Sequence, residues 1–242
     1  MKRTIVAGLG IFLVIMVMTI PARVAYQWLE PDTLLLGRLS GSIWNGAATE
    51  GLVGGAYLTD ITWQLLPSAL LTGKIAFETS ARPISGTVSA EVAMGKNGML
   101  AISHLTGNVP LDLVHDVFQQ AGIDGDLSLR FDTLVLKNNL PVLANGDITV
   151  SNLYARDLSA NPLGSFRANI TTVNGRVTAY VEDVAGVLDV TGVISLNEDR
   201  SYSFIGEVAT MPSAPPSIEQ QFRFLGSPNP AGMRQFRFEG RL

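Results

Sequence analysis

Apolar and polar residues alternate in short runs along most of this 242-residue chain, from about residue 34 to its last residues. In Leu127–Asp132, for example, leucine and phenylalanine alternate with serine, arginine and aspartate. A period of two places the apolar side chains of a strand on one face, which is what antiparallel strands with one buried face require. The alternation therefore predicts an all-β domain of roughly a dozen strands.

Turn-forming residues separate these runs. Asn138-Asn139, Asn174-Gly175 and residues 197–199 are typical of tight reversals. The last of them predicts a hairpin between Val187–Leu196 and Ser201–Ala209. Helical signals are few and short, and they cover Pro67–Leu71, Leu111–Gln120 and Ser217–Leu225. The expected architecture is a mostly antiparallel, strongly curved sheet or a β-sandwich-like domain, with two or three short helices.

A weak internal repeat, apolar-x-Gly-x-apolar, supports the curved sheet. It occurs at residues 39–43, 84–88, 105–109, 190–194 and 238–242. A glycine on the inner face of a strand relieves crowding or permits a strong bend. The repeat therefore favours a sheet with marked curvature.

An uncharged apolar run, Thr4–Ala22, precedes the alternating region and follows Lys2 and Arg3. As a helix it would be about 28 Å long, close to the thickness of a bilayer's hydrocarbon core. The run is longer than the apolar part of a signal peptide and lacks a good Ala-x-Ala cleavage site, so we expect an uncleaved transmembrane anchor. Its central anchor residues are Ile11, Phe12, Leu13, Val14, Ile15 and Met16.

The sequence thus divides into four parts. We expect a cytoplasmic tip at residues 1–3, a transmembrane helix at 4–22, a juxtamembrane linker at 23–33 and a β-rich domain at 34–242. Basic residues lie on both sides of the run, so the positive-inside rule orients it weakly. A very short leading segment before a large domain fits insertion with the N-terminus inside, as a single-pass protein.

Composition and motifs argue against several kinds of chemistry. The net charge is −4 and no run of Lys and Arg could follow a phosphate backbone, which argues against a nucleic-acid partner. The chain has no cysteine, so it has no thiolate metal site and no cysteine nucleophile. His115 with Asp112 and Asp116 lacks recognised ligand spacing, and Asp124-Gly125-Asp126 lacks the closing Glu of a calcium loop. We expect neither catalysis nor a cofactor or metal.

Three large aromatic residues stand out near the start of the β-rich region. They are Trp44, Tyr57 and Trp63, and the alternation predicts that Tyr57, Ile61 and Trp63 share one face. Large apolar side chains build cores, and they also anchor docking surfaces. We therefore expect Trp44, Tyr57 and Trp63 to form a structurally important patch, with docking as its alternative role.

Several segments together resemble the N component of the bacterial type II secretion system. The first is the apolar run followed by 39–48, with Ser42 where the family commonly has threonine. The second is Leu58–Trp63 followed by Leu65-x-Pro67-x-Ala69-Leu70-Leu71-x-Gly73. The third extends from Gly192 through Pro215-Pro216 and Phe224-Leu225-Gly226 to the last seven residues. The resemblance covers nearly the whole chain in the same order.

The resemblance implies a single-pass protein of the bacterial inner membrane, with its N-terminus cytoplasmic and its C-terminal domain periplasmic. It implies an accessory, scaffolding subunit that supports export of folded proteins from the periplasm across the outer membrane. The implied partners are other inner-membrane subunits of the apparatus and the outer-membrane secretin. The alternative is a periplasmic lipid-binding or lipid-transfer module with an apolar groove, by analogy of fold only.

Overall fold

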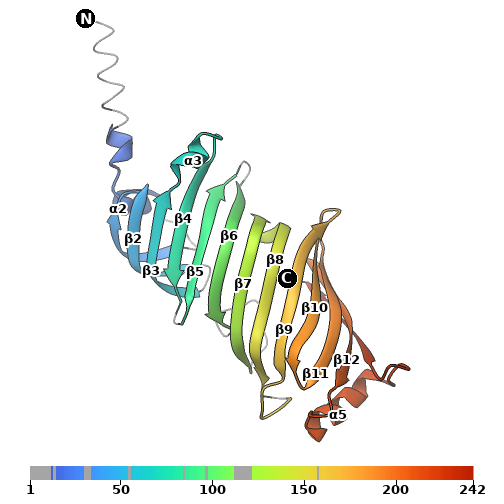
Figure 1. Cartoon of the computed structure of the whole chain (residues 1–242). Helices are drawn as coiled ribbons and strands as arrows, with labels where there is room; N and C mark the ends of the chain where they lie inside the picture. The colour runs from blue at the N-terminus through green and yellow to red at the C-terminus, as the bar shows by residue number, and fades with distance from the viewer. Residues whose placement is uncertain are drawn as a thin grey trace, which may run out of the picture. The chain divides into compact units, whose positions relative to one another are not determined.

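The structure is a computed structural model of the chain, and it describes residues 12, 15–29, 34–53, 56–83, 85–95, 98–111, 122–156 and 158–241. The chain divides into two compact units, Met1–Ile84 and Ser85–Leu242. The described residues form 13 strands, four in the first unit and nine in the second, with a few short helices (Figure 1). This confirms the all-β, antiparallel prediction.

The first unit is an antiparallel meander in the order β1, β2, β3, β4. Its strands are β1 (Leu34–Gly41), β2 (Asn45–Val53), β3 (Ala56–Leu65) and β4 (Ile75–Arg82). Helix α2 (Ala22–Leu29) precedes β1, so much of the expected linker at 23–33 is helical. Helix α3 (Pro67–Leu70) lies between β3 and β4, where the sequence predicts a helical turn, and proline occupies its first position as helices favour.

The second unit is a nine-stranded antiparallel meander in which each strand pairs with its neighbours in sequence. Its first five strands are β5 (Thr87–Met94), β6 (Met99–Pro110), β7 (Ile123–Lys137), β8 (Leu140–Ala155) and β9 (Gly164–Val173). The others are β10 (Arg176–Gly186), β11 (Leu188–Leu196), β12 (Ser201–Thr210) and β13 (Arg234–Arg241). Helix α5 (Pro216–Phe222) and the 3-10 turn η3 (Arg223–Leu225) connect β12 to β13, which confirms the third predicted helix.

Tight turns set the register of these hairpins. Asn138 and Asn139 have φ of 52° and 61°, and Asn174 and Gly175 have φ of 52° and 77°. Positive φ at both central residues is what a two-residue hairpin with a type I′ turn requires. The hairpin of β11 and β12 also forms as predicted, with Leu188 opposite Thr210 and Leu196 opposite Tyr202. Residues 112–120 of the predicted helix Leu111–Gln120 lie outside the described residues.

All described strands of the second unit belong to one sheet in sequence order, so the sandwich-like alternative is not the one adopted. Short hairpin connections, such as those at 138–139 and 174–175, force the strands that they join to be neighbours, and no described connection carries a strand across to a second layer.

The core of the second unit lies on one face of its sheet, here called the apolar face. Buried Phe131, Ala144, Ile170 and Val177 from β7 to β10 form its centre. Helix α5 covers one end of this face, where Ile218 is only 1% exposed against Leu163 and Leu188. This placement follows from the sequence because α5 carries its apolar residues toward the apolar positions of β11.

Aromatic side chains lie over glycines of the neighbouring strand in both units. The pairs are Trp63 over Gly46, Phe131 over Gly146, Phe204 over Gly192, Phe236 over Gly206 and Tyr202 over Gly240. A Cβ at any of these glycines would come within 2.4–2.8 Å of the aromatic side chain. Gly192 and Gly240 belong to the weak repeat, so at these two positions the glycine makes room for a ring.

Candidate functional site

The N-terminal segment of the first unit is bonded to the turn between β1 and β2. The indole Nε1 of Trp44 donates a hydrogen bond of 2.9 Å to the carbonyl oxygen of Val17. The amide of Ile43 donates to the carbonyl of Ile20 at 3.1 Å, and Pro21 forms a bridge with Ser42. The buried Ala22 then starts α2. These contacts fix how the chain enters the sheet.

Trp63 supports the same turn from inside. Its indole Nε1 donates to the carbonyl of Ser42 at 3.2 Å, and its ring lies over Gly46, where a Cβ would be 2.4 Å from Cζ2. The carbonyl of Trp44 accepts a hydrogen bond of 2.6 Å from the amide of Leu65. The structure therefore brings two of the three predicted patch residues, Trp44 and Trp63, to one turn, here called the tryptophan junction.

Tyr57 lies apart from the tryptophan junction. It pairs with Leu52 at the far end of β3, is 43% exposed and donates a hydrogen bond of 3.1 Å to Glu50 Oε2. That hydrogen bond and the negative charge of Glu50 raise the pKa of Tyr57, because both favour the protonated phenol. The prediction that Tyr57 shares a face with Ile61 and Trp63 is therefore wrong.

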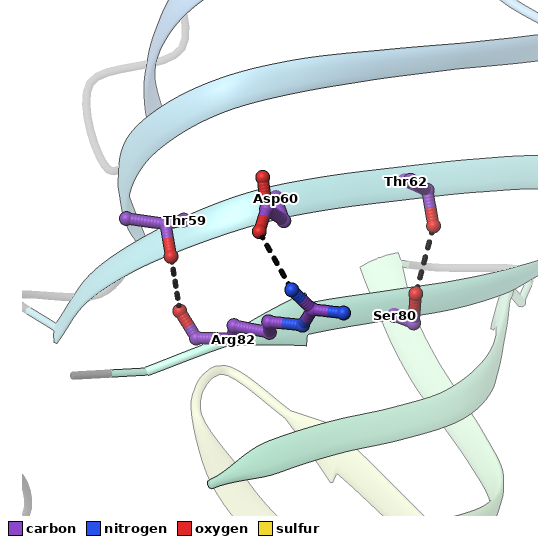
Figure 2. Close-up of polar contacts among 5 residues, drawn as sticks. All are labelled: Thr59, Asp60, Thr62, Ser80 and Arg82. Carbon is purple, nitrogen blue, oxygen red and sulfur yellow. Dashed lines mark hydrogen bonds and ion pairs between the residues drawn. The ribbon is translucent and has the colours of Figure 1, made fainter. Parts of the chain in front are cut away.

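A backbone irregularity at Asp60 explains the change of face. Asp60 has φ of 48°, and the pairing of β3 with β4 shifts register between Thr59 and Thr62. An irregularity of this kind breaks the strict alternation of side chains. Arg82 of β4 contacts two residues of this irregular segment. Its guanidinium lies 3.1 Å from Asp60 Oδ2, and its carbonyl oxygen accepts a hydrogen bond from the hydroxyl of Thr59 (Figure 2).

The predicted anchor residues are only partly within the described chain. Ile11, Leu13 and Val14 lie outside the described residues, whereas Phe12, Ile15 and Met16 are described and exposed. Residues 15–18 are helical, and the Thr19 hydroxyl donates to the carbonyl of Ile15. Within the described part of the chain, no helix has the length and apolarity needed to cross a membrane.

Tyr26 on α2 makes a contact that the sequence did not reveal. Its hydroxyl donates to the carbonyl of Leu34 at 3.0 Å and accepts from the amide of Leu36 at 3.1 Å. Both groups belong to β1, the edge strand of the first unit, so the tyrosine occupies two hydrogen-bonding groups of that edge. The sequence carries no signal for this edge contact.

The apolar face of the second unit is continuous from strand to strand. One row of register partners, from β6 to β13, consists entirely of apolar residues. They are Leu105, Phe131, Gly146, Ile170, Ala179, Ile194, Phe204 and Phe238. The row runs from half-buried Leu105 through the core to Phe238, which is 58% exposed on the edge strand. Such a face can pack against another apolar surface.

The opposite face of β9 to β12 carries an open depression of about 570 Å³. Tyr180, Val193 and Ile205 line it as cross-strand neighbours, beside Glu182 and Glu207. The side chains of Asn229 and Gln235 donate hydrogen bonds of 3.2 Å to Glu207 Oε1. The depression has the mixed character of a docking surface, and sequence reasoning did not single it out.

The remaining candidates for chemistry stay separate. His104 on β6 is exposed and lies 3.4 Å from Glu91 Oε1, and Asp124 bonds the amide of Gly125 within an irregular part of β7. His115, Asp112 and Asp116 lie outside the described residues. Among the residues that the structure does describe, no cluster of three or more His, Asp or Glu side chains could hold a metal ion.

Comparisons with known proteins bear on the family. Residues 32–237 match the family model described as type II secretion system (T2SS), protein N. The chain is also similar to the type II secretion system protein N of Aeromonas hydrophila, with 28% identity over 255 aligned positions that cover 98% of this chain and 96% of that protein. No solved structure matches it. These findings confirm the resemblance seen in the sequence, and the chain belongs to the type II secretion system protein N family.

Proposed function

We propose that this chain is an accessory, scaffolding subunit of the type II secretion apparatus. Its N-terminal run, residues 4–22, would anchor it in the bacterial inner membrane, and its β-rich part would lie in the periplasm. There it would support export of folded proteins by contacting other inner-membrane subunits and the outer-membrane secretin. The proposal contains no catalytic step and no cofactor. Family membership supports the assignment to the type II secretion apparatus, and the contacts of the N-terminal segment support the scaffolding role.

The observation that carries the scaffolding role is the tryptophan junction. The hydrogen bonds from Trp44 to Val17 and from Ile43 to Ile20 tie the last residues of the apolar run itself to the turn between β1 and β2. A scaffold must present its binding surfaces in a defined direction, and a fixed junction achieves this where a flexible linker would not. A membrane anchor also raises the effective concentration near membrane partners, so weak contacts can suffice.

Deletion of the gene, followed by complementation, tests the role. We expect deletion to lower the amount of a secreted substrate in the medium and to leave that substrate in the periplasm. The intact chain should restore secretion and should co-purify with at least one other subunit of the apparatus. Unchanged secretion after deletion, or purification without any apparatus subunit, would contradict the proposal.

A matched pair of variants tests the junction itself. Trp44→Ala removes the hydrogen bond to Val17, whereas Trp28→Ala changes a tryptophan that is 77% exposed on α2. At equal protein levels, complementation by Trp44→Ala should be weaker than by Trp28→Ala. Equal complementation by the two variants would show that the junction has no part in secretion.

A second function, lipid binding, is favoured by the continuous apolar face of the second unit. Helix α5 covers only the end of that face near Leu163 and Leu188. Phospholipid chains require such an apolar surface, although the rings over glycines fill part of it. Native mass spectrometry of the chain purified in mild detergent distinguishes the two functions. Stoichiometric co-purified phospholipid would support lipid binding, and its absence would leave scaffolding as the remaining candidate function.

A further inference from the structure

The outer edge of β13, the last strand of the second unit, has no pairing partner among the described strands. β13 is the last strand of its sheet, and β12 is its one pairing partner among the described strands. In the first unit, the Tyr26 hydroxyl occupies two groups of the β1 edge, the Leu34 carbonyl and the Leu36 amide. An open row of backbone N–H and C=O groups is a template for another strand. Within the described part of the second unit, the outer edge of β13 is therefore available for pairing.

From Gln235 to Arg241 the side chains of β13 alternate between its two faces, whereas Arg234 at its start lies on the apolar face opposite Val208. Phe236, Phe238 and Gly240 lie on the apolar face, opposite Gly206, Phe204 and Tyr202 of β12. Gln235, Arg237, Glu239 and Arg241 lie on the other face. Arg237 Nε donates to Glu239 Oε1 at 2.9 Å in the same strand. Any strand that adds here must continue an apolar row on one side and meet two arginines and one carboxylate on the other.

We propose that the occupant is β13 of a second copy of this chain, antiparallel, with Phe238 opposite Phe238 across a two-fold axis. In this register Arg237 lies opposite Glu239 of the second copy, twice by symmetry. Phe236 lies opposite Gly240 of the second copy, which repeats the ring-over-glycine pairs found inside the sheet. The row that ends at Phe238 would continue without a break into the second copy.

Registers shifted by one residue, or centred on Arg237 or Glu239, are worse for reasons of charge and face. Directly opposite residues lie on the same face, so a shift by one residue in the pairing would place apolar side chains opposite charged ones. A two-fold axis through Arg237 would place two arginines opposite each other, and an axis through Glu239 would do the same with two glutamates. Like charges directly opposite are destabilising. The sequence of β13 is thus self-complementary in the register centred on Phe238.

The absence of cysteine from the chain allows a direct test by single-cysteine cross-linking. The full-length chain, purified in detergent, is treated with an oxidant, because a disulfide forms only between cysteines whose Cα atoms lie within about 7 Å of each other. Phe238→Cys should cross-link with itself, and Arg237→Cys should not. An equimolar mixture of Arg237→Cys and Glu239→Cys chains should form a mixed dimer. Far-UV circular dichroism confirms that each variant retains its strands.

Charge reversal gives the second readout. Arg237→Glu places glutamate opposite Glu239 of the second copy and should weaken dimerisation about tenfold, measured by sedimentation velocity. The double change Arg237→Glu with Glu239→Arg restores opposite charges and should restore the dimer. The proposal is overturned if the unmodified chain sediments as a single copy, or if Arg237→Cys cross-links with itself as well as Phe238→Cys does. Equal dimerisation of the single and double charge variants would also overturn it.

Discussion

Replacement of Gly192 is expected to destabilise the fold, because the ring of Phe204 occupies the space that a side chain at this position would need. A Cβ at Gly192 would lie 2.7 Å from Cε2 of Phe204, closer than non-bonded carbons approach. Its next neighbours are the carbonyl of Ile205 at 3.1 Å and Cα of Gly206 at 3.3 Å, which small shifts can accommodate. The main obstacle to Gly192→Ala is therefore one aromatic ring.

The contact with Phe204 sets the expected loss in free energy of unfolding. Forcing an extra methyl group into a packed site costs about 1–3 kcal/mol, and here the ring must also leave its edge-on contact with Phe236, whose centroid is 4.8 Å away. We expect Gly192→Ala to lower the free energy of unfolding by about 2 kcal/mol. For a unit of this size that corresponds to a fall in melting temperature of about 4 to 8 °C. Urea titration followed by far-UV circular dichroism measures it.

A double-mutant cycle with Phe204→Leu isolates the proposed cause. Once the ring is gone, Gly192→Ala should cost about 1 kcal/mol less than it does in the parent chain. Gly146 supplies the contrast, because a Cβ there would lie 2.3 Å from the backbone carbonyl of Arg130. Replacing Phe131 should therefore not rescue Gly146→Ala. Additive effects of Gly192→Ala and Phe204→Leu would refute the reasoning.

Three further predictions concern single contacts. Tyr26→Phe should lower the free energy of unfolding by about 1–2 kcal/mol and speed hydrogen exchange at the Leu36 amide, because that amide loses its acceptor. Arg82→Ala should change stability in a urea titration by less than about 1 kcal/mol, because both it and Asp60 are exposed. Hydrogen bonds from the hydroxyl and the amide of Ser201 lower the pKa of Asp199. The small stabilising contribution of the Asp199 carboxylate should therefore be lost as the pH falls through that lowered pKa. NMR titration of the Asp199 carboxyl should therefore give a midpoint below the ordinary one, and an ordinary midpoint would contradict this.

The strands of this protein could be predicted from sequence because their signals are local. Alternation gave the apolar side of β7, and paired asparagines and Asn-Gly gave hairpin turns whose residues have positive φ. The failure at Tyr57 is equally local in cause. The left-handed conformation of Asp60 breaks the alternation within β3. Asp147 and Asp189 lie in strands without a positive φ, so an aspartate alone does not predict such an irregularity.

The choice between one sheet and two stacked sheets could not be made in the same way. A strand with one apolar face has the same alternation whether that face packs on a second sheet, on α5 or on its own neighbours. The contacts of the tryptophan junction could not be predicted from the sequence either. Trp44 and Trp63 were recognised as large anchors, but their hydrogen bonds to Val17 and Ser42 depend on how the N-terminal segment returns to the first hairpin.

The meander topology makes the ends of the sheet the positions where added contacts matter most. Every described strand of the second unit pairs only with described strands that are its neighbours in sequence, so stability is close to a sum of strand-to-strand interfaces, as in repeat proteins. An inner strand such as β10 has two such interfaces, whereas β13 has one. The partly exposed Phe238 is therefore the point at which the apolar row is least protected. Pairing with a second β13 would give this strand the interface that its inner neighbours already have, without any change in the rest of the sheet.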